Sequence, residues 1–84
     1  MKTIEIYTTM FCPFCSRAKS LLNSKGVKFK EIDVTSDLKG RKEMSKRSFG
    51  ATSVPQVFVN GNHIGDCEYI HKLDASGELD HILA

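Results

Sequence analysis

Two cysteines separated by two residues are the part of this sequence best suited to covalent chemistry. They stand in the segment Cys12-Pro13-Phe14-Cys15, between an expected first strand and an expected first helix. A Cys-x-x-Cys pair in a strand–helix–strand context is typical of sites of thiol–disulfide exchange. The pattern therefore predicts two thiols that form and break a disulfide bond.

The place of the pair next to a helix predicts unequal roles for the two sulfur atoms. Pro13 suits the first helical position, because the N–H that proline lacks would have no partner there. Cys12 would then precede the helix, where free N–H groups and the helix dipole stabilise a thiolate and lower the thiol pKa. Cys15, one turn into the helix, is expected to be more buried and less acidic. We therefore expect Cys12 to attack and Cys15 to resolve the mixed disulfide.

Two other interpretations of the cysteines stay open. A structural zinc site needs four ligands, and Cys67 and His71, four residues apart on an expected helix, could supply a second pair. Alternatively, Cys12 and Cys15 could be unrelated core residues, since cysteine is often buried. The proline and the position before a helix favour redox chemistry over both.

Length and composition are ordinary for one small globular domain. The chain has 84 residues, 40% of them hydrophobic and 26% charged, with a formal net charge of +2. We expect a single domain over residues 1–84 without a structural metal. The weak positive charge does not indicate nucleic-acid binding. A basic cluster is either a solvated helix face or a positive field beside an anion site. It comprises Lys39, Arg41, Lys42, Lys46 and Arg47.

The N-terminal segment gives no indication of export. It carries charged residues and lacks the apolar stretch of a secretion signal, and no segment of the chain is long and apolar enough for a membrane span. Three cysteines, an odd number, fit poorly with a secreted disulfide framework. We expect a cytoplasmic protein with no membrane partner, and a monomer by default.

Hydrophobic patterning predicts the element order β-α-β-α-β-β-α-α. Strands are expected at residues 3–7, 27–34, 57–59 and 62–64, and Asn60-Gly61 favours a type I′ hairpin. Helices are expected from Pro13 to a Gly26 cap, from a Ser36 or Asp37 cap to Arg47, over 67–75 after an Asp66 cap, and over 78–83. A parallel β-α-β unit and a hairpin together make a mixed four-stranded sheet flanked by helices.

Some side chains receive structural roles at this stage. In the second expected helix, Leu38 and Met44 are predicted to point inward. Cys67 is interpreted as a packing residue that contributes its backbone. The three histidines show no arrangement with partners and are interpreted as surface residues; they are His63, His71 and His81.

Three blocks, in order and at similar spacing, resemble the dithiol glutaredoxins over nearly the whole chain. They are Cys12-Pro13-Phe14-Cys15, the segment 53–59 (Ser-Val-Pro-Gln-Val-Phe-Val) and the segment 63–67 (His-Ile-Gly-Asp-Cys). The resemblance implies an α/β thioredoxin fold, with Cys12 and Cys15 forming the redox-active disulfide. It also implies a glutathione-dependent oxidoreductase that reduces protein disulfides and protein–glutathione mixed disulfides. Glutathione would be the reductant, with no permanently bound cofactor.

The same resemblance implies a glutathione groove beside the thiols. A cis Val54-Pro55 bond would let the Val54 backbone pair with glutathione as an added strand. N–H groups at the third helix start would hold the γ-glutamyl carboxylate, and the carboxylate of Asp66 or Glu68 would meet its ammonium. The implied binding residues are Thr9, Phe14, Arg41, Ser53, Val54, Pro55, Asp66, Cys67 and Glu68.

The chain departs from the family pattern at charged positions. Thr9 stands where a lysine is common, Thr52 where an arginine is frequent, and Asp66 adds an anion. These changes are expected to weaken binding of a net-negative ligand. Two alternatives stay open: a redoxin served by thioredoxin reductase, and a glutaredoxin that binds an iron–sulfur cluster between two chains, which the stiff Pro13 disfavours.

Overall fold

The computed structural model describes residues 2–84, and four strands form one mixed sheet. The strands are β1 (Ile4–Thr8), β2 (Lys30–Asp33), β3 (Gln56–Val59) and β4 (Asn62–Gly65). Their order across the sheet is β2-β1-β3-β4, with β1 and β2 parallel and the other neighbours antiparallel. The helices are α1 (Pro13–Ser24), α2 (Leu38–Arg47), α3 (Cys67–Ala75) and α4 (Glu78–Leu83). The predicted element order and mixed sheet are confirmed.

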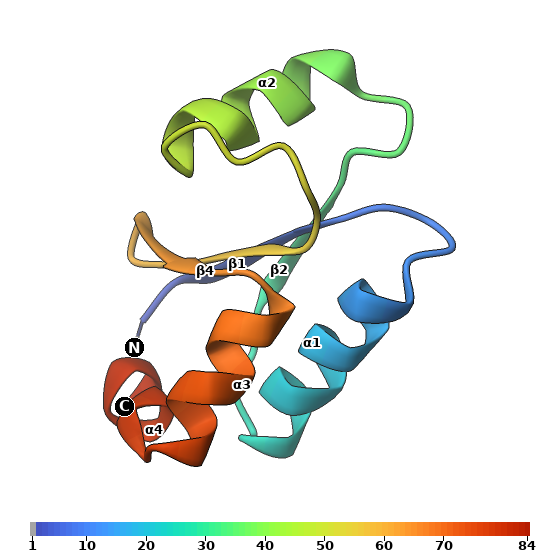
Figure 1. Ribbon diagram of the computed structural model, residues 1–84. Helices are drawn as coiled ribbons and strands as arrows, with labels where there is room; N and C mark the ends of the chain where they lie inside the picture. The colour runs from blue at the N-terminus through green and yellow to red at the C-terminus, as the bar shows by residue number, and fades with distance from the viewer. Residues whose placement is uncertain (1) are drawn as a thin grey trace.

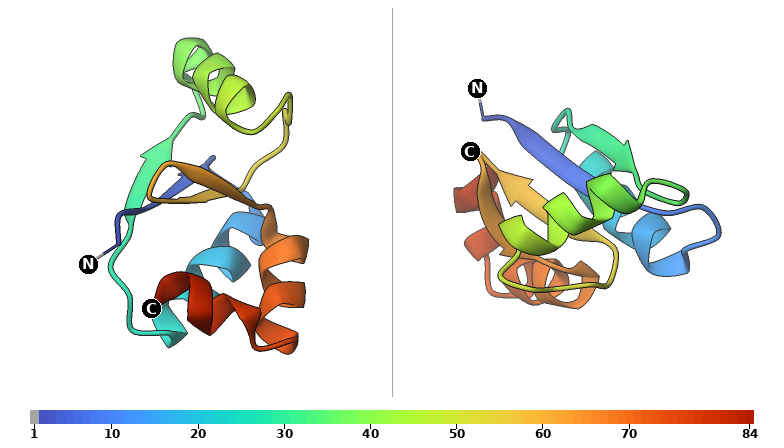
Figure 2. Two further views of the ribbon diagram at one scale, coloured as in Figure 1. Left: turned by 90° about the vertical axis from the view of Figure 1, so that its left-hand side faces the viewer. Right: turned by 90° about the horizontal axis from the view of Figure 1, so that it is seen from above.

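The sheet separates two hydrophobic clusters of unequal size. Helices α1, α3 and α4 cover one face, and α2 alone covers the other (Figures 1 and 2). Successive residues of β1 and β3 supply the two clusters in turn, because neighbouring side chains in a strand point to opposite faces. The buried members of the larger cluster are Ile4, Ile6, Ala18, Leu22, Val57, Val59, Cys67 and Ile70. Those of the smaller cluster are Tyr7, Val34, Met44 and Phe58.

A charged side chain completes the smaller cluster. The Arg47 guanidinium, at the end of α2, donates to Glu5 Oε1 and to the Tyr7 hydroxyl, each at 2.8 Å. Its central carbon lies 4.3 Å from the Phe58 ring centroid. This contact is a cation–π interaction, which adds to the ion pair with Glu5. The end of α2 is thereby held to β1 and β3.

Local signals in the sequence account for several element ends. Asp37 Oδ1 accepts from the Gly40 N–H at 2.9 Å, and Asp66 Oδ1 accepts from the Tyr69 N–H at 2.9 Å, so both predicted N-caps are confirmed. Asn60 and Gly61 have φ values of 51° and 81°, as a type I′ turn requires. The β3–β4 hairpin is therefore closed as predicted.

Three sequence predictions about this framework are wrong. The second strand covers Lys30–Asp33 rather than 27–34, because only those residues pair with β1; Val27 and Phe29 pack against the core from irregular chain. Leu38 begins α2 and is 78% exposed, so Met44 is the inward residue. His63 is not a surface residue, since it is half-buried on β4.

Within residues 2–84, no helix has both the length and the apolar character needed to cross a membrane.

Candidate active site

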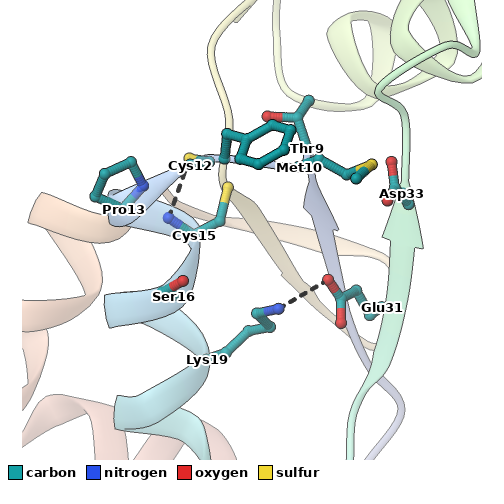
Figure 3. A pocket seen from close by; sticks show the side chains of 10 residues that line it. Thr9, Met10, Cys12, Pro13, Cys15, Ser16, Lys19, Glu31 and Asp33 are labelled. Carbon is teal, nitrogen blue, oxygen red and sulfur yellow. Dashed lines mark hydrogen bonds and ion pairs between the residues drawn. The ribbon is translucent and has the colours of Figure 1, made fainter.

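Cys12 occupies the N-cap of α1, and Pro13 follows at the first helical position. The Cys12 backbone is extended (φ −112°, ψ 102°), and its sulfur accepts from the Cys15 N–H at 3.1 Å. Sulfur thus takes the place that an oxygen usually has in an N-cap. Figure 3 shows the two cysteine side chains at the start of the helix. A thiolate at Cys12 would accept this N–H from the end of the helix that favours negative charge.

Cys15 differs from Cys12 in burial and acidity. Its side chain is 2% exposed, whereas Cys12 is half-buried. Burial, and after it the hydrogen bond with Cys12, raises the pKa of Cys15 to about 12. Cys15 is therefore protonated at neutral pH. The arrangement leaves Cys12 as the thiol that a disulfide from solution can reach.

A polar cleft lies on the β2 side of the two cysteines. Its volume is about 430 Å³. Lys19 Nζ pairs with Glu31 Oε2 at 3.0 Å across it (Figure 3). Thr8 Oγ1 donates to the same oxygen at 2.7 Å. We call it the β2-side cleft; its lining residues are Thr9, Met10, Phe11, Cys12, Pro13, Cys15, Ser16, Lys19, Glu31 and Asp33.

A second cavity lies on the β3 side, between the starts of α1 and α3. Its volume is about 200 Å³, and we call it the β3-side groove. Its lining residues are Phe14, Ser53, Val54, Pro55, Asp66, Cys67 and Glu68. The structure thus gathers all but two of the residues predicted to bind glutathione. Of those two, Thr9 lines the β2-side cleft, and Arg41 donates from Nη2 to the Thr52 carbonyl at 3.2 Å, next to the groove.

The loop before β3 is fixed by a buried amide that the sequence analysis missed. The Val54-Pro55 bond is cis, as expected. Gln56 Nε2 donates to the Ser53 carbonyl at 3.0 Å, and Gln56 Oε1 lies 2.6 Å from His63 Nε2. The signal that could have revealed this pair is a glutamine inside a hydrophobic strand, because a buried amide needs partners.

Cys67, at the start of α3, is buried in the larger hydrophobic cluster. Burial raises the pKa of its thiol. His71 Nδ1 lies 2.8 Å from the Cys67 carbonyl oxygen and 3.6 Å from its sulfur, so the half-buried His71, like His63, is not the free surface residue expected. His81 is exposed. Among residues 2–84, no three His, Cys, Asp or Glu side chains are placed to hold one metal ion.

Comparisons with known proteins agree with this geometry. A family model described as Glutaredoxin matches residues 4–64, which include both cysteines of the α1 start and the loop before β3. Glutaredoxin 3 of Escherichia coli strain K12 is 51% identical over 83 residues, which cover 99% of this chain and 99% of that protein. The start of α3 lies beyond the family match but within this longer alignment.

Solved structures are similar as well. The solution structure of a glutaredoxin from Brucella melitensis has a TM-score of 0.84 at 42% identity, over 96% of this chain and 87% of that one. A crystal structure of a buckwheat glutaredoxin–glutathione complex has a TM-score of 0.87 at 26% identity, over 98% of this chain and 76% of that one. These similarities confirm the expected thioredoxin fold.

Proposed function

This chain belongs to the glutaredoxin family, and from that premise we propose that it reduces protein disulfides and protein–glutathione mixed disulfides. Glutaredoxins are thiol–disulfide oxidoreductases that use glutathione, and this chain is such an enzyme. The observation that carries the proposal is the pairing of a half-buried N-cap cysteine with a buried, weakly acidic cysteine one turn later.

The first route needs Cys12 alone. Its thiolate attacks the glutathione sulfur of a protein–glutathione mixed disulfide; the S–S bond breaks, and the protein thiolate leaves and takes a proton from solvent. Cys12 is then bonded to glutathione. A second glutathione thiolate attacks the glutathione sulfur on Cys12, which releases glutathione disulfide and restores the Cys12 thiolate. Over the whole cycle, one free glutathione is consumed: its sulfur loses one electron, the protein sulfur gains one, and the glutathione that came from the substrate remains at the disulfide level.

The second route also needs Cys15. Cys12 attacks one sulfur of a protein disulfide and forms a mixed disulfide with it. Cys15 loses its proton and attacks the Cys12 sulfur, which forms the Cys12–Cys15 disulfide and releases the reduced protein. Two glutathione molecules then reduce this disulfide. Formation of the mixed disulfide makes Cys15 easier to ionise, because the Cys12 sulfur is then no longer a neighbouring anion that raises the Cys15 pKa.

The β3-side groove is the proposed glutathione site. In the related buckwheat protein, glutathione is bound in a complex. Here the Asp66 carboxylate already caps α3 through Tyr69, whereas Glu68 is exposed and its nearest cation is Lys72 at 3.5 Å. Glu68 is therefore the carboxylate better placed for the glutathione ammonium. Phe14, 57% exposed at the groove wall, offers an apolar surface to the peptide backbone of glutathione.

The remaining parts of the proposal concern the setting of the reaction. We propose that residues 1–84 act as one domain and as a monomer in the cytoplasm, with no nucleic-acid, membrane or metal partner. The weakly positive formal charge of +2 is compatible with substrates of varied charge. Glutathione, and proteins that carry disulfides or glutathione adducts, are the proposed partners.

A coupled assay tests the proposed electron donor. Bis(2-hydroxyethyl) disulfide would be incubated with glutathione, glutathione reductase and NADPH, and NADPH loss would be followed for the native chain and for Cys12→Ser. We expect turnover by the native chain and none above background for Cys12→Ser. A second mixture with thioredoxin reductase in place of glutathione and its reductase should be inactive. Turnover only in that second mixture would contradict the proposal.

A further inference from the structure

Exposed apolar side chains surround Cys12. Met10, Phe11 and Phe14 are 58%, 97% and 57% exposed. Phe14 faces the β3-side groove, whereas Met10 and Phe11 line the β2-side cleft together with Cys12. Single apolar residues on a surface are ordinary, but here two consecutive ones directly precede the nucleophile. Neither contributes to the two hydrophobic clusters.

The backbone holds Phe11 outward. Its φ is +57°, a conformation that bulky residues adopt only rarely and at a cost. The preceding residue is fixed, because the Met10 N–H donates to Thr35 Oγ1 at 2.8 Å, and this hydroxyl donates to Asp33 Oδ1 at 2.6 Å. The loop therefore presents the Phe11 ring to solvent from a defined position.

Thiol–disulfide exchange at Cys12 brings the substrate backbone close to the loop that carries Met10 and Phe11. A disulfide bond is about 2.05 Å long, so in the mixed disulfide the substrate backbone lies within a few ångströms of the Cys12 backbone. Residues next to the substrate cysteine must then contact residues next to Cys12. Those on the β2 side meet Met10 and Phe11, since the β3 side is the groove proposed for glutathione.

The net charge of the β2-side cleft makes it suited to a different ligand from the glutathione proposed for the β3-side groove. In the β2-side cleft the charged groups are Lys19, Glu31 and Asp33. Lys19 pairs with Glu31, whereas Asp33 hydrogen-bonds only to the Thr35 N–H and hydroxyl. The cleft therefore keeps a net negative charge. That charge disfavours glutathione, a net anion with two carboxylates and one ammonium, and favours a segment with a basic residue.

We propose that Met10 and Phe11, with Asp33 beyond them, form a docking surface for polypeptide substrates that have a large apolar residue next to the reactive cysteine and a basic residue after it. This inference rests on the proposed function and deepens it, because it assigns a substrate preference to the same reactive cysteine. The apolar residue packs on the Phe11 ring and the Met10 side chain, and the basic residue reaches the Asp33 carboxylate.

Symmetric peptide disulfides provide the test, because both of their sulfur atoms are equivalent. One dimer would carry cysteine followed by phenylalanine and lysine, and a second would replace the phenylalanine by serine. Turnover with glutathione, glutathione reductase and NADPH would be compared as kcat/KM. We expect the native chain to prefer the phenylalanine dimer by about 5- to 20-fold, the effect of partly burying one aromatic ring.

The matched variants are Phe11→Asn and Phe49→Asn. Phe49 is also strongly exposed (92%) and also has a positive φ, +60°, but it follows α2 and lines neither cavity at the cysteines. Asparagine tolerates a positive φ, so both variants keep the backbone and lose the ring. We expect Phe11→Asn to reduce the preference to below about twofold and Phe49→Asn to keep it.

A third dimer tests the charge. It would carry glutamate in place of lysine, and we expect the native chain to turn it over about 2- to 5-fold more slowly, a difference that Asp33→Asn removes.

The outcomes separate this inference from the proposed function. Equal rates for the phenylalanine and serine dimers in the native chain, or an unchanged preference in Phe11→Asn, would overturn the docking surface while turnover of bis(2-hydroxyethyl) disulfide continued. Absence of glutathione-dependent turnover on every substrate would instead overturn the proposed function and the docking surface with it. A urea unfolding transition with the same midpoint as that of the native chain would show that Phe11→Asn is folded.

Discussion

Helices α1 and α3 lie on one face of the sheet (Figure 1), and their starts line one groove. Each start contains a buried cysteine. At α1 the cap is the sulfur of Cys12, which accepts from the Cys15 N–H. At α3 the cap is the carboxylate of Asp66, which accepts from the Tyr69 N–H. Both buried thiols, Cys15 and Cys67, have pKa values raised by burial.

The difference between the two helix starts lies in the capping atom. A helix start stabilises whichever anion caps it, so a thiol in that place becomes a nucleophile, whereas a carboxylate there leaves the start as a binding surface. Burial does the opposite to the buried cysteine of each start, Cys15 at α1 and Cys67 at α3, since it keeps the thiol protonated. Only at α1 does the buried thiol have a capping sulfur to exchange with.

The largest effect is expected from giving α1 the same kind of capping group as α3, a carboxylate. Cys12→Asp keeps an N-cap acceptor, so α1 should form normally, but no nucleophile remains and turnover should fall at least about 10³-fold. NADPH-coupled turnover and a thermal melt measure the two quantities. Ser20→Ala, an exposed α1 position outside both cavities, is the matched control and should behave as the native chain. An active Cys12→Asp protein would refute the role of Cys12.

A second variant separates the two thiols within α1. Cys15→Ser should slow the reduction of disulfide-linked peptides at least about tenfold, because the mixed disulfide on Cys12 has no resolving thiol. The rate at which glutathione is removed from a glutathionylated peptide should stay within about threefold of the native rate, since this reaction needs Cys12 alone. The two rates are compared in one preparation. Equal loss of both activities would show that Cys15 has another role.

The buried thiols should also make the reduced protein sensitive to alkali. The pKa of Cys15 is raised from 9.0 to about 12 in the folded chain, so the unfolded chain loses this proton first. The resulting stabilisation is fully present below about pH 9 and is lost as the pH rises from 9 towards 12. Urea midpoints of the reduced protein at pH 8 to pH 11 should fall less steeply for Cys15→Ser than for the native chain. Parallel curves would contradict the raised pKa.

The smallest effect concerns the cap of α3. Asp66→Ala leaves the Tyr69 N–H without its acceptor and should lower the free energy of unfolding by about 1 kcal/mol. Asp37→Ala removes the equivalent cap of α2 and is the matched control, with a loss of about the same size. Denaturant unfolding measures both. A loss at Asp37 alone would mean that α3 is held by packing rather than by its cap.

The sequence predicted best those features that local chemistry determines. Pro13 and the two aspartate caps determine where helices begin, and Asn60-Gly61 determines the hairpin turn, because each acts within a few residues. The β3-side groove could also be predicted in outline, since most of its residues belong to short motifs that keep their spacing. The roles assigned to those residues stay predictions.

Features that depend on partners distant in the sequence could not be predicted. The alternation at 27–34 does not reveal that, within this segment, only Lys30–Asp33 form the strand that pairs with β1. Nor does the helical pattern around Leu38 reveal that the start of α2 extends beyond the core. The partner of His63 is seven residues away on the neighbouring strand, and the sequence gives no pairing between them. In each case the pairing or burial depends on the tertiary fold, which the periodicity of the sequence does not determine.

The Gln56 amide also determines the tautomer of His63. Because Gln56 donates through Nε2 to the Ser53 carbonyl, its oxygen is the atom that faces the imidazole, so His63 Nε2 must carry the hydrogen. An added proton can then enter only at Nδ1, and burial lowers the pKa at which it does so. Acidification would therefore charge the ring without breaking the chain of hydrogen bonds that supports the Ser53–Pro55 loop, and the wall of the groove would keep its shape.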